Sequence, residues 1–97
     1  MAAGDWKELY LSAQNGNLEL VKYHIKMGVD PNHQHPEFMT TPLIVSIENQ
    51  HIEIVEFLLK NGSDATIKED FGHHTPLSMA KFTKNQKLID LINAHLQ

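Results

Sequence analysis

Four of the seven histidines in this 97-residue chain lie in two short segments that also carry carboxylates. These residues are His33, His35 and Glu37 in the first segment, and Glu69, Asp70, His73 and His74 in the second. Imidazole and carboxylate groups are common ligands of zinc. If the two segments converge, they predict a metal-binding sensor or a metal-dependent enzyme. If they do not converge, they are polar loops exposed to water.

The rest of the composition points away from catalysis. The chain has no cysteine, so it lacks a disulfide, a thiolate nucleophile and a cysteine ligand for zinc. It carries no metalloprotease or nucleotide-binding signature. Acidic pairs such as Glu53 and Glu56 are typical of a solvated helix face. We therefore expect no enzymatic activity, no cofactor and no bound metal.

Charge and hydropathy restrict the partners and the location. The formal net charge is -4, and the eight Lys and Arg residues are scattered, which argues against binding to nucleic acid. No apolar run approaches the roughly 18 residues of a membrane-spanning helix. The segment from Met1 to Trp6 lacks the basic and apolar regions of a secretory signal. We expect a cytoplasmic monomer that contacts no membrane.

An internal repeat appears when the sequence is shifted along itself by 34 residues. The matching segments are Asn15–Val21 with Asn49–Val55, Lys26–Asp30 with Lys60–Asp64, and Thr41–Leu43 with Thr75–Leu77. The shift divides a single domain, residues 1–97, into three units at about 5–33, 38–67 and 72–97. The loop histidines do not fall on one another under this shift, so no ligand geometry is repeated.

Each unit carries the signals of two antiparallel helices. A threonine followed by proline is typical of the start of a helix, and an asparagine is placed to cap the second helix of a unit. The second helices are amphipathic, with apolar residues at three- and four-residue steps. Gly28 and Gly62 follow them and are suited to the left-handed conformation that ends a helix. The predicted N-caps are Asn17, Thr41, Thr75 and Asn85.

The first and last units differ from the middle one. Asp5 stands three residues before Glu8, which is the spacing of a capping box. The last helix, Gln86 to Leu96, is apolar on one side and carries Lys87 and Asp90 on the other. Because nothing covers the ends of a stack of repeats, the end units need polar outer faces. We expect such a face at both ends.

The units resemble the ankyrin repeat family over essentially all of Asp5 to Leu96. The resemblance rests on Thr-Pro-Leu at 41–43 and 75–77, on Ile52-Glu53-Ile54-Val55 followed by Leu58-Leu59, and on Gly62-Ser63-Asp64. It implies an all-α solenoid of three helix-turn-helix units with hairpin loops between them.

Two features depart from the family pattern. Ile44 and Ser78 replace the histidine that follows Thr-Pro-Leu, which leaves the hydrogen bonds of that histidine in question. The period is also one residue longer than usual, with the extra residue in each hairpin loop. The longer loops favour a role in binding, or they reflect neutral drift, because added loop length costs little.

The resemblance also implies a function, namely binding another protein through the hairpin loops and the adjoining face of the first helices. Phe38, Met39 and Phe71 are apolar residues in polar loops and are candidate anchors, unless the two phenylalanines fold back against neighbouring hairpins. Phe82 corresponds to Gln14 and Glu48 at the ends of first helices. The expected partner-binding residues are Gln14, Asn15, His33, His35, Phe38, Met39, Glu48, Asn49, Asp70, Phe71, His73, His74, Phe82 and Thr83.

Two features of this surface complete the sequence-based expectations. It is acidic and rich in histidine, which favours a basic or neutral partner. Two histidines outside the loops have structural explanations instead. His24 aligns with Leu58 and is predicted to lie partly in the core, and His51 matches the usual histidine before the second helix of an ankyrin repeat.

Overall fold

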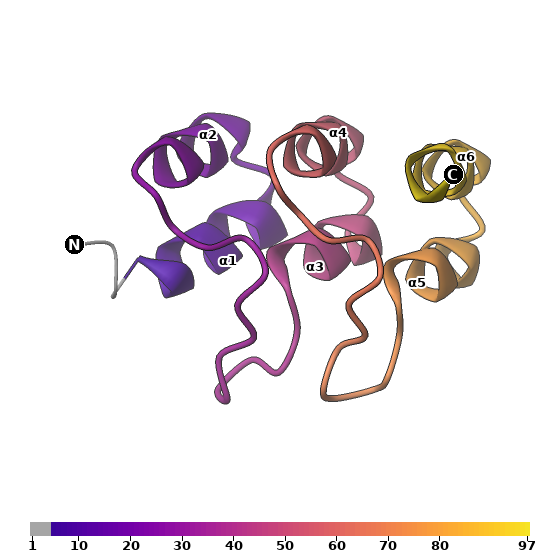
Figure 1. Cartoon of the computed structure of the whole chain (residues 1–97), viewed down its shortest axis with the longest axis horizontal. Helices are drawn as coiled ribbons and strands as arrows, with labels where there is room; N and C mark the ends of the chain where they lie inside the picture. The colour runs from indigo at the N-terminus through magenta and orange to yellow at the C-terminus, as the bar shows by residue number, and fades with distance from the viewer. Residues whose placement is uncertain (1–4) are drawn as a thin grey trace.

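The computed structural model describes residues 5–97, which contain six α-helices and no β-strand. The helices are α1 (Trp6–Asn15), α2 (Leu18–Lys26), α3 (Pro42–Glu48), α4 (Ile52–Lys60), α5 (Pro76–Thr83) and α6 (Gln86–Leu96). The first helices α1, α3 and α5 form one layer, and the second helices α2, α4 and α6 form the other (Figure 1). The predicted all-α repeat fold is confirmed.

The connections between units leave the stack on one side. Residues 29–40 form the first hairpin loop and residues 63–74 the second, and both extend beyond the layer of first helices (Figure 1). The stack measures 36 × 25 × 24 Å. Within residues 5–97, no helix has both the length and the apolar character needed to cross a membrane.

The first helices of the second and third units start as their sequences predict. Thr41 Oγ1 accepts a hydrogen bond from the Ile44 N–H at 3.2 Å. Thr75 Oγ1 accepts one from the Ser78 N–H at 3.1 Å. In both helices proline follows the cap, where its missing N–H leaves no helical bond unmade.

The second helices also begin and end at the predicted signals. Asn17 Oδ1 accepts from the Leu20 N–H at 3.2 Å, and Asn85 Oδ1 accepts from the Lys87 N–H at 3.1 Å. Gly28 and Gly62 have φ angles of 94° and 105°, a left-handed conformation that residues with a Cβ rarely adopt. The helix ends are therefore set by local sequence.

The predicted capping box at Asp5 is wrong. Asp5 precedes α1, but its side chain makes no capping hydrogen bond. Its backbone lies at φ -88° and ψ -5°, within the helical range, whereas a capping residue needs an extended backbone to turn its side chain toward the next N–H groups. Glu8 is exposed in the first turn of α1.

The core is continuous along the stack and lies between the two layers. His24 lies in this core, as predicted, because only 7% of its surface is exposed. Its Nδ1 has no hydrogen-bond partner. The buried apolar residues are Leu9, Ala13, Val21, Val29, Leu43, Ile44, Val45, Ile47, Ile54, Val55, Leu58, Leu59, Ala65, Met79, Ala80, Leu88 and Ile92.

The two residues that replace the family histidine have different roles. Ile44 is completely buried in the core. The Ser78 hydroxyl accepts a hydrogen bond from the Thr75 N–H at 2.9 Å and lies 2.9 Å from His74 Nδ1. In the third unit, Ser78 and His74 together therefore make polar contacts at the helix start, whereas Ile44 contributes apolar packing in the second unit.

The two end faces of the stack differ, and the expectation of a polar face at both ends is wrong for the first unit. On α6, Gln86, Asp90 and Asn93 are exposed. On α2 and at its C-cap, however, Leu20, Tyr23 and Met27 are exposed by 41%, 54% and 55%. The first unit thus leaves an apolar stripe uncovered at its second helix.

Candidate protein-binding surface

The base of the first hairpin loop is tied to the unit that follows. Asn32 Nδ2 donates a hydrogen bond to the Gly62 carbonyl oxygen at 2.9 Å. The Asp64 N–H donates to Asn32 Oδ1 at 2.8 Å. Asp64 in turn accepts hydrogen bonds from the Thr66 N–H and hydroxyl, at 2.8 and 2.6 Å. One asparagine side chain therefore links the end of α4 to the preceding loop.

The tips of the two hairpin loops are also tied together. Gln34 Nε2 donates to the Lys68 carbonyl oxygen at 3.0 Å, and the Asp70 N–H donates to Gln34 Oε1 at 2.9 Å. The Met39 carbonyl oxygen accepts from the N–H groups of Asp70 and Phe71 at 3.0 and 3.1 Å. Because each loop positions the other, the two loops form one continuous surface.

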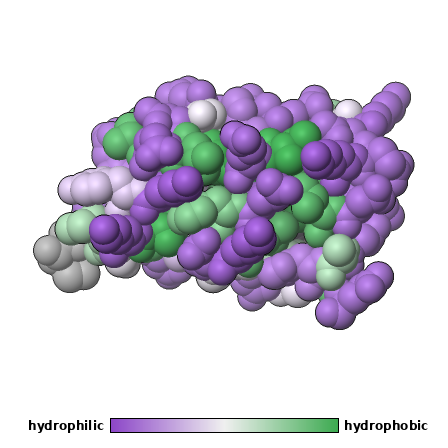
Figure 2. Space-filling model, turned by 90° about the horizontal axis from the view of Figure 1, so that it is seen from above, coloured by the Kyte–Doolittle hydropathy of each residue, from purple (hydrophilic) through white to green (hydrophobic). Residues whose placement is uncertain are grey.

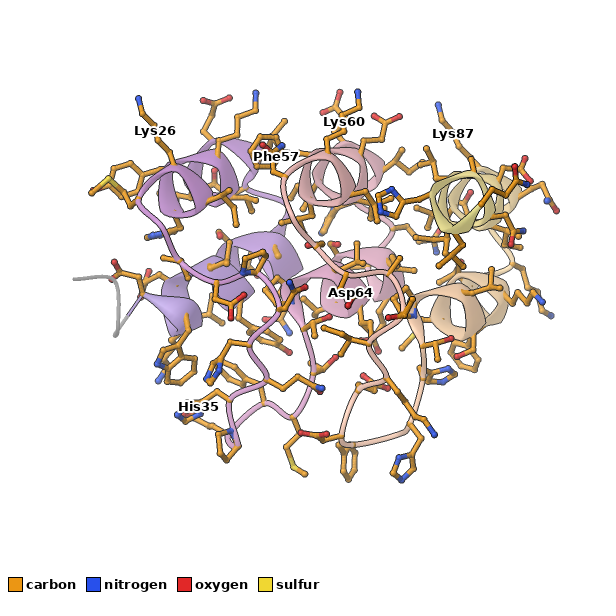
Figure 3. The ribbon with its side chains drawn as sticks, viewed as in Figure 1. Lys26, His35, Phe57, Lys60, Asp64 and Lys87 are labelled. Carbon is orange, nitrogen blue, oxygen red and sulfur yellow. The ribbon has the colours of Figure 1, made fainter. Side chains whose placement is uncertain are left out.

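Aromatic stacking holds the first hairpin loop against α1. The rings of Trp6 and His35 are stacked, with centroids 3.5 Å apart and planes 7° from parallel. The rings of Tyr10 and Phe38 are stacked at 3.9 Å. His35 lies near the tip of the loop, on the side of α1 (Figure 3). His35 and Phe38 are therefore half-buried, and Phe38 folds back onto a helix rather than onto a neighbouring hairpin.

The second hairpin loop presents its aromatic residue to solvent instead. Phe71 is exposed over 73% of its surface, and Phe82 at the end of α5 over 70%. The His74 ring lies 5.5 Å from the Phe82 ring, between centroids. Two large apolar side chains are thus exposed, one in the second hairpin loop and one at the end of α5.

Buried polar contacts give the second loop its shape. Glu69 is only 8% exposed, and one carboxylate oxygen accepts a hydrogen bond from the His74 N–H at 3.3 Å. The Glu69 N–H donates to the His74 carbonyl oxygen at 2.9 Å. Glu69 therefore has a structural role in the loop.

Backbone strain is found at the same place in both loops. Met39 and His73 are equivalent under the 34-residue shift, and their φ angles are 59° and 62°. Left-handed backbone is uncommon for residues with a Cβ. Gln50 and Lys84, which are also equivalent and lie in the turns between the helices of a unit, have φ angles of 58° and 62°, so left-handed backbone recurs with the repeat.

The ends of the first helices complete the surface. Asn15, Glu48 and Asn49 are exposed, while Gln14 and Thr83 are half-buried. Asn49 Nδ2 donates to the Val45 carbonyl oxygen, and Thr83 Oγ1 donates to the Ala80 carbonyl oxygen. These bonds to the preceding turn fix the side chains at the helix ends.

Negative charge gathers beside Tyr10. Burial raises the pKa of the Tyr10 hydroxyl, and the carboxylates of Glu48 and Glu69 raise it further. Tyr10 therefore remains a neutral hydrogen-bonding group between an acidic helix end and an acidic loop.

The loop histidines do not converge on a metal site. Within residues 5–97, no group of three His, Asp or Glu side chains is arranged to hold a metal ion. His35 is stacked on Trp6, His74 lies against Ser78, and Glu69 accepts from a backbone N–H. The described residues give no support to the metal-binding hypothesis.

Sequence reasoning missed the residues that organise this surface. Trp6 and Tyr10 lie one turn apart on α1, a spacing that places two aromatic rings on one side of a helix. That signal was available in the sequence. Asn32 and Gln34 correspond to Thr66 and Lys68 under the repeat, so no pattern marks them.

The fold and the surface together define a class of protein. Stacked helix pairs whose loops project to one side form a solenoid with an extended surface, the architecture of repeat proteins that bind other macromolecules. The family model described as ankyrin repeats, in three copies, matches residues 9–95. The chain therefore belongs to the ankyrin repeat family, whose repeats generally serve as protein–protein interaction modules. The comparison with curated protein sequences found no match.

Proposed function

We propose that this chain is a protein-binding module that acts through the two hairpin loops and the adjoining ends of α1, α3 and α5. The observation that carries the proposal is the exposure of Phe71 in the second hairpin loop and of Phe82, which lies beside His74, at the end of α5. Large aromatic side chains in contact with water are costly for a free protein but serve as anchors in interfaces.

The charge of this side of the molecule supports a basic segment of the partner as the ligand. The excess of carboxylates over lysines lies here, since the second helices carry both signs. The carboxylates of the first helices and connections are Asp5, Glu8, Asp30, Glu37, Glu48, Asp64, Glu69 and Asp70, against Lys7, Lys68, Lys81 and Lys84. Complementary charge would accelerate encounter, and the phenylalanines would slow dissociation.

Binding is proposed as the whole activity of residues 1–97. We propose that the module acts in the cytoplasm, without catalysis, a cofactor or nucleic acid. The absence of cysteine from the sequence and its acidic balance favour this view.

The test compares three forms of the chain in affinity capture with quantitative mass spectrometry. The wild type and a control variant, Tyr23→Ala with Met27→Ala on α2, should retain the same partner. The variant Phe71→Ala with Phe82→Ala should lose most of it. If the Phe71→Ala, Phe82→Ala variant and the Tyr23→Ala, Met27→Ala variant retain the partner equally well, the proposed binding surface is wrong.

Added salt should reveal the electrostatic part of the interaction with the partner so identified. The association rate should fall as ionic strength rises, and the dissociation rate should change less. An association rate that does not respond to salt would remove the argument for a basic partner.

A further inference from the structure

The outer side of α2 carries an apolar stripe that lacks a covering helix among residues 5–97. Leu20, Tyr23 and Met27 are three and four residues apart, so they lie on one side of the helix. The α2 outer face is defined here as these three residues with Glu19 and Lys26.

The internal repeat shows which way this face points. The equivalents of Leu20 in the later units are Ile54 and Leu88, which are 2% and 0% exposed because a preceding second helix covers them. Phe57, the equivalent of Tyr23, lines a shallow groove between α2 and α4. The face therefore continues the interface that joins α2 to α4 and α4 to α6.

The same groove places the two charged residues of the face. Glu53, the equivalent of Glu19, lines the groove on the side of α2, and Lys60, the equivalent of Lys26, lines both this groove and the one toward α6. Figure 3 shows Lys26 and Lys60 both pointing away from the layer of first helices. Glu19 therefore flanks the stripe on its open side and Lys26 lies on the outward crest of α2, near opposite ends of the helix.

The opposite end of the stack does not complement this stripe. Glu56 and Leu59 of α4 line the groove toward α6, and their equivalents on α6 are Asp90 and Asn93. Both are polar and exposed. Head-to-tail stacking would place the stripe against Asn93, where the groove between α4 and α6 has the apolar Leu59. The hydrophobic patches along the second helices (Figure 2) do not extend to that end.

We propose that the α2 outer face binds the same face of a second copy of this chain, with the two α2 helices antiparallel about a two-fold axis. In this arrangement Leu20 of one copy meets Met27 of the other, and the two Tyr23 rings meet at the axis. Glu19 of each copy lies beside Lys26 of the other, so the face is complementary to itself in charge as well as in shape.

The resulting dimer is weak and closed. A pair of short helices covers less than the roughly 1,200 Å² that stable protein complexes bury, so association depends on concentration. Because the contact is two-fold, assembly stops at two copies rather than continuing into a filament. The dimer leaves the hairpin loops free, so this proposal is independent of the proposed function, and it replaces the monomer expected from the sequence.

Sedimentation velocity at protein concentrations between about 10 µM and about 1 mM tests the proposal. This range detects a dimer whose dissociation constant is about 1 mM or lower. The sedimentation coefficient of the wild type should rise with concentration toward that of a dimer and no further. Tyr23→Glu should abolish the rise. A wild type that remains monomeric throughout, or that grows beyond a dimer, overturns the proposal.

Charge reversal supplies the more specific test. Glu19→Lys and Lys26→Glu should each raise the dissociation constant of the dimer about fivefold, because two exposed ion pairs become repulsive. The double variant, and an equal mixture of the two single variants, should recover the wild-type value. The matched controls Glu53→Lys and Lys60→Glu on α4 should change nothing. If the single variants dimerise as the wild type does, or if neither the double variant nor the mixture recovers, the antiparallel arrangement is wrong.

Discussion

His51 Nε2 lies 2.9 Å from the backbone carbonyl oxygen of Gln14, across the boundary between the first and second units. The imidazole thereby satisfies a carbonyl in the last turn of α1, where no further turn of helix follows. This bond gives His51 a structural role. It connects Gln14, a residue of the candidate surface, to the start of α4 in the next unit.

Replacing His51 by Ala should lower the free energy of unfolding by about 1 to 3 kcal/mol, because the Gln14 carbonyl loses its partner in a half-buried place. Urea unfolding followed by circular dichroism measures the effect. His33→Ala, at an exposed loop position, is the control and should change stability by less than about 0.5 kcal/mol. Equal losses for both variants would contradict a structural role for His51.

Leu58 is completely buried in the middle of the stack. Leu58→Ala should cost about 2 to 5 kcal/mol, because it leaves a cavity between units that stabilise one another. Unfolding in urea should remain a single transition, since the neighbouring units depend on the middle one. Two resolved transitions would show that the units unfold independently.

His24 offers a stabilising substitution. Its buried Nδ1 has no hydrogen-bond partner, and the equivalent residue in the next unit is Leu58. His24→Leu should raise the free energy of unfolding by about 1 kcal/mol, because an unsatisfied buried nitrogen is removed while the volume is kept. His24→Ala should lower stability instead, since it creates a cavity. If His24→Leu lowers the free energy of unfolding, the imidazole makes a stabilising contact that leucine cannot replace.

Asp64 should make stability depend on pH at the acid end. The Thr66 hydroxyl and backbone N–H hold the pKa of the Asp64 carboxyl below its ordinary value of 3.8. A carboxyl with a lowered pKa stabilises the fold above its ordinary value, and that contribution is lost as pH falls through the lowered value.

Melting temperatures at pH 5, 3.5 and 2.5 measure this loss. The variant Asp64→Asn should be less stable than the wild type at pH 5, and the difference should shrink toward pH 2.5. Glu53→Gln, at an exposed helix position, provides the control for general acid effects. A constant difference between Asp64→Asn and wild type at every pH would mean that ionisation of Asp64 is irrelevant.

The exposed phenylalanines should not contribute to folding. Phe71→Ala and Phe82→Ala should each change the free energy of unfolding by less than about 0.5 kcal/mol, as expected for exposed side chains. Phe38→Ala should cost more than either, because its ring is stacked on Tyr10. Denaturant titration of the three variants separates a ring kept for binding from a ring kept for stability, and a large loss at Phe71 or Phe82 would remove it from the candidate anchors.

The sequence alone determined the features of this protein that are local. Thr41, Thr75, Asn17 and Asn85 cap helices because a short polar side chain reaches N–H groups within its own first turn. The helix pairs and their order also follow from the repeat, since each unit carries its own apolar pattern. The cap predicted at Asp5 is wrong because capping depends on backbone angles as well as on residue type.

Only the tertiary structure decided which of several chemically similar residues face water. Phe38 and Phe71 are both phenylalanines in hairpin loops, yet Phe38 is covered because Tyr10 lies beside it, and Phe71 is left exposed. Leu20 and Ile54 occupy equivalent positions, but only Ile54 has a preceding second helix to cover it. Burial depends on neighbours that are distant in sequence. Residue type and periodicity therefore predicted the helices, while the packing of one unit against the next determined the surface.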